Sequence, residues 1–143
     1  MQPRHLVLCS LIVLGALTAT ALAQEAKQEV DPDFPPCVVK TVPANRAKDV
    51  DCRVREIKVT FDRPMFTRGM WSWIILRANG VYPGTRGGPK PRWEDGGRTC
   101  VLPVHLSPDT VYAIGVNSPR HTGFRDTKGK VAVPHAWVFK TTK

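Results

Sequence analysis

Basic side chains are mixed with aromatic ones in two stretches of the chain, and this combination can bind an anionic polymer. Guanidinium and ammonium groups contact phosphate or carboxylate groups, while an aromatic ring stacks on a base or a sugar. The candidate patch takes its members from residues 86–98 and from the loop 118–130: Arg86, Lys90, Arg92, Trp93, Arg98, Arg120, Arg125, Lys128 and Lys130. The alternative is that Trp71, Trp73 and Trp93 cover the hydrophobic core, which would leave no stacking surface.

The histidines and glycines form no recognisable catalytic, metal-binding or phosphate-binding motif. His105, His121 and His135 lie in separate segments without HxH or HExxH spacing, and a metal site would need distant groups to converge. The glycine-rich stretch 84–88 lacks the Lys-Ser/Thr ending of a phosphate-binding loop. Cys100 has no local catalytic signature. The sequence therefore predicts a non-enzymatic protein that uses no cofactor and no metal.

The first 23 residues read as a secretory signal peptide. A basic start at Arg4 and His5 precedes an apolar run over residues 6–17, and Ala21-Leu22-Ala23 supplies a small-x-small cleavage site. The apolar run is shorter than an ordinary membrane span. Two alternatives are an uncleaved anchor and a lipoprotein signal at Cys9. The predicted mature protein, residues 24–143, is exported to the cell envelope or secreted, without a membrane span after cleavage.

Charge is distributed unevenly along the predicted mature chain. Residues 24–36 form an acidic, proline-containing linker or tail, whereas the remainder from Cys37 carries 19 basic against 8 acidic residues. A compact domain with this excess produces a positive field, which favours contact with anionic partners. The same charge would also serve an ordinary, soluble Lys- and Arg-rich surface.

An odd number of cysteines remains after signal cleavage. Cys37, Cys52 and Cys100 allow at most one intramolecular disulfide. Cys37 and Cys100 begin strands expected on either side of a central strand, so about 9–10 Å would separate them, too far for a bond. No pair is predicted, and Cys100 is expected to be a buried, small apolar residue.

Apolar residues recur every second position in several short stretches, which is typical of half-buried strands. In the clearest stretch Cys100, Leu102 and Val104 are expected to face one way and Thr99 and Val101 the other. Strands are expected over residues 37–42, 54–61, 71–77, 90–94, 98–104, 111–117 and 136–141. Seven short strands with turn-rich connections predict an all-β, antiparallel β-sandwich of about seven strands over residues 37–143.

The same alternation predicts the core and three structural positions. Tyr112 follows a Leu-Ser-Pro-Asp turn, where a tyrosine corner is expected: its hydroxyl bonds nearby backbone while its ring fills the core. Pro64 should end a strand where the chain crosses between sheets. Trp137 should be in the core with the other inward residues, which are Ile57, Val59, Phe61, Ile75, Leu102, Leu106, Tyr112, Ile114, Val116 and Phe139.

Several motifs, in order, resemble bacterial Ig-like domains of the S-layer-protein (SbsA) type over residues 37–142. Val42-Pro-Ala-Asn45 with Lys48-Asp-Val50 is similar to the family's SPANGATDV opening, and Ile57–Met65 is similar to ITVTFSEPM. Residues 97–99 and 106–112 resemble GKT and LAPGTTYTV, 126–129 resembles DAAGN, and 137–142 resembles the closing WSFTT. The tryptophan-rich strand at Trp71, the basic segment 82–92 and the three cysteines depart from the family pattern.

The resemblance implies an immunoglobulin-like sandwich without shared catalytic residues. Domains of this kind resemble spacers, stalks and adhesion modules of exported proteins. We therefore expect a structural or protein-interaction module with an unidentified protein or envelope partner. The alternative is a basic extracellular protein that binds an acidic glycan, lipopolysaccharide or nucleic acid.

Overall fold

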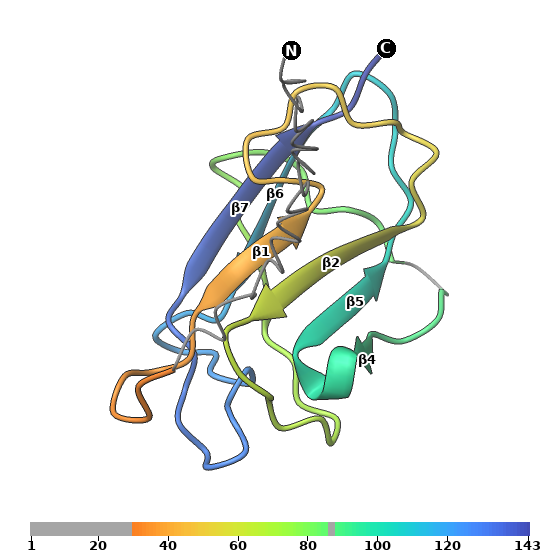
Figure 1. Cartoon of the computed structure of the whole chain (residues 1–143). Coiled ribbons are helices and arrows are strands. Elements are labelled where there is room, and N and C mark those ends of the chain that lie inside the picture. Colours follow the sequence, from red (N-terminus) through yellow and green to blue (C-terminus); the bar gives the residue numbers. More distant parts are fainter. Residues whose placement is uncertain (1–29, 86–87) are drawn as a thin grey trace, which may run out of the picture.

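The computed structural model describes residues 30–85 and 88–143, so the predicted signal peptide, the first part of the acidic segment and Arg86 lie outside the described residues. Figure 1 shows two packed layers of strands. In the described residues there are seven strands and one short 3-10 helix, which are β1 (Val38–Val42), β2 (Glu56–Phe61), β3 (Trp73–Ile75), β4 (Arg92–Glu94), η1 (Asp95–Gly97), β5 (Thr99–Pro103), β6 (Val111–Val116) and β7 (His135–Lys140).

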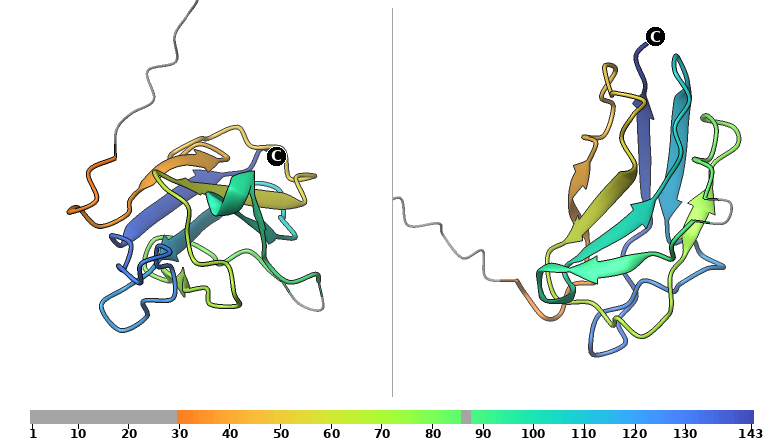
Figure 2. Two further views of the ribbon diagram at one scale, coloured as in Figure 1. Left: turned by 60° about the horizontal axis from the view of Figure 1, so that its bottom comes forward. Right: turned by 90° about the vertical axis from the view of Figure 1, so that its right-hand side faces the viewer.

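The strands form a four-stranded sheet with the order β1-β2-β5-β4 and a three-stranded sheet with the order β3-β6-β7. Every pair of neighbouring strands is antiparallel. Figure 2 shows the two sheets face to face. This arrangement confirms the predicted all-β, antiparallel sandwich. It also confirms that the strand after Cys37, β1, and the strand that contains Cys100, β5, flank a shared central strand, β2.

β5 departs from the expected alternation because all five of its residues are buried. Val101 lies on the outer face, where its register partners are Lys58 on β2 and Arg92 on β4. The long side chains of these two residues extend to Glu94, with which both form ion pairs. Since lysine and arginine stems can cover apolar surface while their charged groups stay in water, the outer face of β5 is sheltered as well as the inner one.

Connections gather at the two ends of the sandwich. The loop end is formed by residues 30–37, 62–72, 95–98 and 117–134, and the far end by residues 43–55, 76–85, 88–91, 104–110 and 141–143. Lys130 Nζ at the loop end donates to the carbonyl oxygens of Pro32 and Asp33, at 2.8 and 2.9 Å. Pro36 is buried, and its carbonyl accepts from the Val133 amide at 2.8 Å. Residues 32–36, predicted as the end of a linker, therefore pack against the sandwich.

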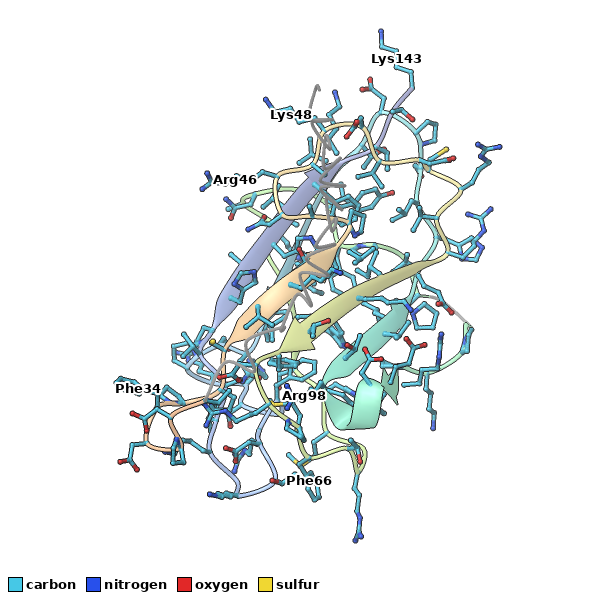
Figure 3. All side chains as sticks on the ribbon, in the orientation of Figure 1. Phe34, Arg46, Lys48, Phe66, Arg98 and Lys143 are labelled. Carbon is cyan, nitrogen blue, oxygen red and sulfur yellow. The ribbon has the colours of Figure 1, made fainter. Side chains whose placement is uncertain are left out.

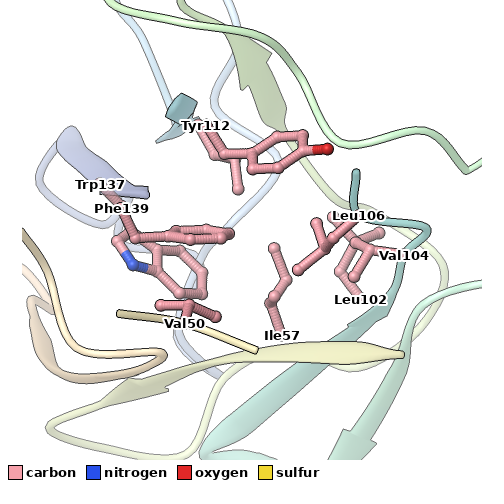
Figure 4. Packing of buried hydrophobic residues seen from close by; sticks show 9 residues of the cluster. Val50, Ile57, Leu102, Val104, Leu106, Tyr112, Trp137 and Phe139 are labelled. Atoms are coloured by element: carbon pink, nitrogen blue, oxygen red, sulfur yellow. The ribbon is translucent and has the colours of Figure 1, made fainter. Parts of the chain in front are cut away.

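The core between the sheets has two connected regions. One surrounds Trp137, Phe139 and Tyr112 (Figure 4), and the other contains Phe61, Val59, Cys100 and Phe124. Every predicted core residue is buried except Ile75, which is 50% exposed. The prediction for Ile75 is wrong because β3 is a three-residue edge strand and Ile75 is its last residue.

Tyr112 and Pro64 lie at a turn and at a strand end in the structure. The hydroxyl of Tyr112 accepts a hydrogen bond from the Ser107 amide at 2.7 Å, while its ring stacks on Phe139 with centroids 5.5 Å apart. Thr141 completes this corner, because its Oγ1 donates to the Ser107 carbonyl and accepts from the Thr110 amide. Pro64 follows the end of β2, where the chain leaves one sheet for the other.

Candidate functional site

The sequence-predicted basic patch divides into two groups in the structure. Lys90 and Arg92 belong to the β4 edge, with Lys90 exposed just before that strand. Arg98 lies at the loop end together with the basic residues of the loop 118–130. Figure 3 labels Arg98 at this end. The fold therefore brings only the second group of candidate residues together at one end.

Arg92 is engaged by two carboxylates. Its Nη1 and Nη2 donate to Glu56 at 2.7 and 3.0 Å, and Nη2 also donates to Glu94 at 2.9 Å. The hydrogen bonds that Arg92 donates to Glu56 and Glu94 raise the pKa of Arg92. In turn, the hydrogen bond with Arg92 lowers the pKa of Glu56. The pKa of Glu94 is lowered mainly by its hydrogen bond with Lys58 and to a smaller extent by that with Arg92. Because its charge is balanced within the sheet, Arg92 has little attraction left for an anionic ligand.

Trp71, Trp73 and Trp93 cover the hydrophobic core, which is the alternative that the sequence offered to a ligand-stacking surface. Trp93 points inward from β4, and its ring centroid lies 6.1 Å from that of Phe61 and 6.0 Å from that of Phe124. Trp73 meets Phe124 edge-on at 5.3 Å, and Trp71 packs against the same cluster. The indole Nε1 atoms of these tryptophans are buried without a hydrogen-bond partner among the described residues. All three tryptophans are only partly exposed and pack against the core, which is what the core-covering alternative predicts.

Two cations of the loop 118–130 hold the protein's own backbone. Arg125 is half-buried, and its guanidinium donates to the carbonyl and hydroxyl oxygens of Thr122, both at 2.8 Å. Lys130 fixes the segment at residues 32 and 33, as described above. Arg120 and Lys128 are exposed and form no ion pair with another described residue. These two residues are thus the cations of this loop with free charge for a ligand.

A groove of about 1090 Å³ lies between the segment 30–39 and the end of β2. Arg98 is exposed on its wall, and Nη1 donates to the Asp62 carbonyl at 3.2 Å. Arg63 is half-buried beside it and pairs with Asp62 at 2.9 Å and with Asp126 at 4.0 Å. Burial would raise the pKa of Asp62, but Arg63 and the Cys37 amide outweigh this effect and lower it.

The apolar part of this groove was not predicted from the sequence. Phe34, Val39 and Val133 line it and are 66%, 57% and 44% exposed. The register of β1 shifts between Val38 and Lys40, which leaves Val39 at a bulge rather than in the regular alternation. Two successive valines in a half-buried strand were the available signal, because strict alternation cannot bury both.

The three described cysteines differ sharply in exposure. Cys37 is exposed on the groove, Cys52 is half-buried at the far end, and all three thiols are free. Desolvation, and then the charge of Asp62, raises the pKa of Cys37. Cys100 is fully buried, as predicted, and burial raises its pKa to about 12. A thiol with this pKa is a packing group, whereas Cys37 is accessible to reagents.

The histidines are placed apart, as their sequence spacing predicts. His105 lies at the far end, where its amide donates to the Gly84 carbonyl at 2.9 Å. His121 pairs with Ser118 in the loop 118–130, and His135 begins β7. Burial lowers the pKa of His135. Among the described residues no group of three or more histidine, cysteine, aspartate or glutamate side chains could hold a metal ion.

Two facing antiparallel sheets, a four-three strand arrangement and a tyrosine corner define an immunoglobulin-like sandwich. The chain belongs to the bacterial Ig-like domain family, whose model matches residues 33–141. This membership confirms the resemblance found in the sequence motifs, and its match begins at Asp33, within the segment that packs on the sandwich. In the part of the chain that the structure describes, no helix is long and apolar enough to cross a membrane.

Two solved structures resemble the chain. One is titled crystal structure of the S-layer protein rSbsC(31-844), with 18% identity and a TM-score of 0.48 over 77% of this chain and 14% of that chain. The other is titled structure of surface layer protein SbsC, domains 1-6, with 20% identity and a TM-score of 0.47 over 78% of this chain and 14% of that chain. The present chain thus spans about one seventh of their length. Comparison with curated proteins found no match.

Proposed function

We propose that this protein is an exported, non-enzymatic Ig-like module that works by contact with a protein or envelope partner. Membership of the bacterial Ig-like family supports this role, because such domains are of a non-catalytic kind. The predicted N-terminal secretory signal supports location in the periplasm, at the cell envelope or outside the cell. Among the ionisable groups that line the groove, Asp62 and Arg63 pair with each other and serve the fold.

The groove beside β1 is the observation that carries this proposal. β1 is the edge strand of its sheet, and its outer side carries Val39 and Val42, which are 57% and 44% exposed. Edge strands present unpaired backbone groups to which another chain can add. Phe34 on the opposite wall adds apolar area, and Arg98 adds a positive charge. An extended, partly apolar segment of a partner fits these features.

Cys37 provides a built-in probe of this surface. In a Cys52→Ser background, a photoreactive crosslinker attached to Cys37 would lie on the groove, while buried Cys100 stays unlabelled. The matched control carries Cys37→Ser with Lys48→Cys at the far end. We expect discrete crosslinked products with the envelope fraction from the Cys37 probe and not from the Lys48 position. Equal products from both positions, or none from Cys37, would refute contact at the groove.

A second candidate function is binding of an acidic polymer. It is supported by the exposed cations at the loop end, Arg98, Arg120 and Lys128, none of which is paired with a carboxylate of the described residues. Heparin affinity measured against salt tests this candidate. Binding through three such groups predicts a slope of about −2 to −3 in log K against log salt. No retention at low salt would eliminate it.

A further inference from the structure

Two loops at the loop end are fastened side by side into one surface. These are the β2–β3 loop, residues 62–72, and the first part of the β6–β7 connection, residues 117–130, and together they are called the paired loops. The Phe66 amide donates to the Arg125 carbonyl at 2.8 Å, and the Gly123 amide donates to Ser72 Oγ at 2.7 Å. A Cβ on Gly123 would lie 2.8 Å from the Trp71 carbonyl carbon, so only glycine permits this contact.

The tip of the β2–β3 loop places apolar side chains in water. Residues 66–70 are all exposed, with Phe66 40% and Met70 49% exposed. Figure 3 shows Phe66 projecting at the loop end. Gly69, with φ of 75°, makes the turn between Arg68 and Met70. The apolar groups therefore project from a convex tip instead of lining a hollow.

The free charge on the paired loops is positive. Arg68, Arg120 and Lys128 are exposed and form no ion pair with another described residue. The acids of these loops, Asp62 and Asp126, have side chains only 14% and 5% exposed, and both face Arg63. The exposed carboxylates at this end belong to the flanking segments, which carry Asp31, Asp33 and Asp95.

We propose that the paired loops form a docking face for an anionic lipid bilayer. Phe66 and Met70 would enter the boundary between headgroups and acyl chains, while the three free cations contact lipid phosphates. Partition to a membrane surface depends on this combination of buried apolar area and attraction to anionic lipid. The inference is independent of a partner at the groove, because the side chains proposed to contact the bilayer, Phe66, Arg68, Met70, Arg120 and Lys128, do not line the groove.

The shape of the surface favours a bilayer over an acidic protein. A convex apolar tip needs a complementary pocket on a protein partner, whereas the fluid headgroup region accommodates it without one. A soluble polyanion would use the three cations but has no use for Phe66 and Met70. The contribution of these two residues therefore separates a lipid surface from a polymer.

The test is flotation of the purified protein with vesicles of phosphatidylcholine that contain phosphatidylglycerol, compared with vesicles of phosphatidylcholine alone. We expect binding to the anionic vesicles only. One variant, Arg68→Glu/Arg120→Glu/Lys128→Glu, should bind at least roughly a hundredfold more weakly, since each cation near such a surface contributes about 1 kcal/mol. A second variant, Phe66→Ser/Met70→Ser, should bind the anionic vesicles at least about tenfold more weakly, while its retention on heparin is unchanged.

The matched control is Lys48→Glu/Arg77→Glu/Lys143→Glu, which has the same net charge and lies at the far end, where Figure 3 labels Lys48 and Lys143. All variants carry the same N-terminal residues, so any contribution of those residues cancels. All replaced residues are exposed, and unchanged urea unfolding verifies the fold. The proposal is overturned by absent flotation of the wild type, by equal loss in both charge variants, or by full binding of Phe66→Ser/Met70→Ser.

Discussion

Replacing Tyr112 by phenylalanine removes one hydroxyl from the corner that closes the sandwich. The hydroxyl accepts the Ser107 amide at 2.7 Å, and the Tyr112 ring is 3% exposed. The ring, its stacking on Phe139 and its burial all persist in the variant. The change therefore isolates a single hydrogen bond that fixes the turn between β5 and β6.

The cost follows from the amide that loses its acceptor. An unsatisfied buried donor costs about 1–3 kcal/mol, and the Ser107 amide is only partly buried, so the lower part of that range applies. We expect Tyr112→Phe to lower the free energy of unfolding by about 1–2 kcal/mol. The melting temperature should fall by roughly 4–8 °C.

Urea unfolding followed by tryptophan fluorescence measures this loss, with the m-value showing that the unfolding transition itself is unchanged. Tyr82→Phe is the matched control, because the half-buried Tyr82 hydroxyl makes no hydrogen bond with another described residue. Its cost should be below about 0.5 kcal/mol. The reasoning about the corner is refuted if both variants lose the same stability, or if Tyr112→Phe loses none.

Three further predictions concern thiols, acid and packing. Thiol reagents should modify Cys37 in the folded protein, and faster as pH rises because the thiolate is the reactive form; its raised pKa moves this increase to higher pH than for a free thiol. Cys100 should react only on unfolding, as mass spectrometry of the labelled protein would show. The pKa of Asp62 is lowered, so its stabilising contribution is present above about pH 4 and is lost as pH falls further. Asp62→Asn should therefore flatten the acid limb of stability against pH, and an unaltered limb would exclude this role. Gly115→Ala should cost about 1–3 kcal/mol in urea unfolding, because the new Cβ would lie 2.8 Å from Ile74 Cβ on the neighbouring strand, and a neutral effect would contradict this packing.

The fold was predictable because period-two alternation reports directly on burial in half-buried strands. Ile57, Val59 and Phe61 alternate with polar residues on β2, and all three are buried. Ile75 has the same sequence signal, but it is exposed because it is the last residue of the short edge strand β3. Val101 shows the opposite case: it lies on the outer face of β5 but is buried, because side chains on two other strands cover it.

The candidate site was less predictable, because a charge count does not show which charges are paired. The sequence alone indicates a free cation at Arg92, whereas strand pairing places Arg92 between Glu56 and Glu94. Trp93 was adjacent to basic residues in sequence, yet the alternation within β4 directs its ring to the opposite face. Phe66 had no place in the predicted candidate patch. Its exposure arises from the pairing of two loops that are far apart in the chain.

Amide hydrogen exchange of the purified protein, with and without its native envelope fraction, tests most directly whether this module works by contact at the loop end and the groove beside β1. The account predicts slower exchange in residues 30–42, 62–72 and 117–130 when the envelope is present. It predicts unchanged exchange at the far end, in residues 76–85 and 104–110. Protection confined to the far end, or no protection anywhere, would contradict it.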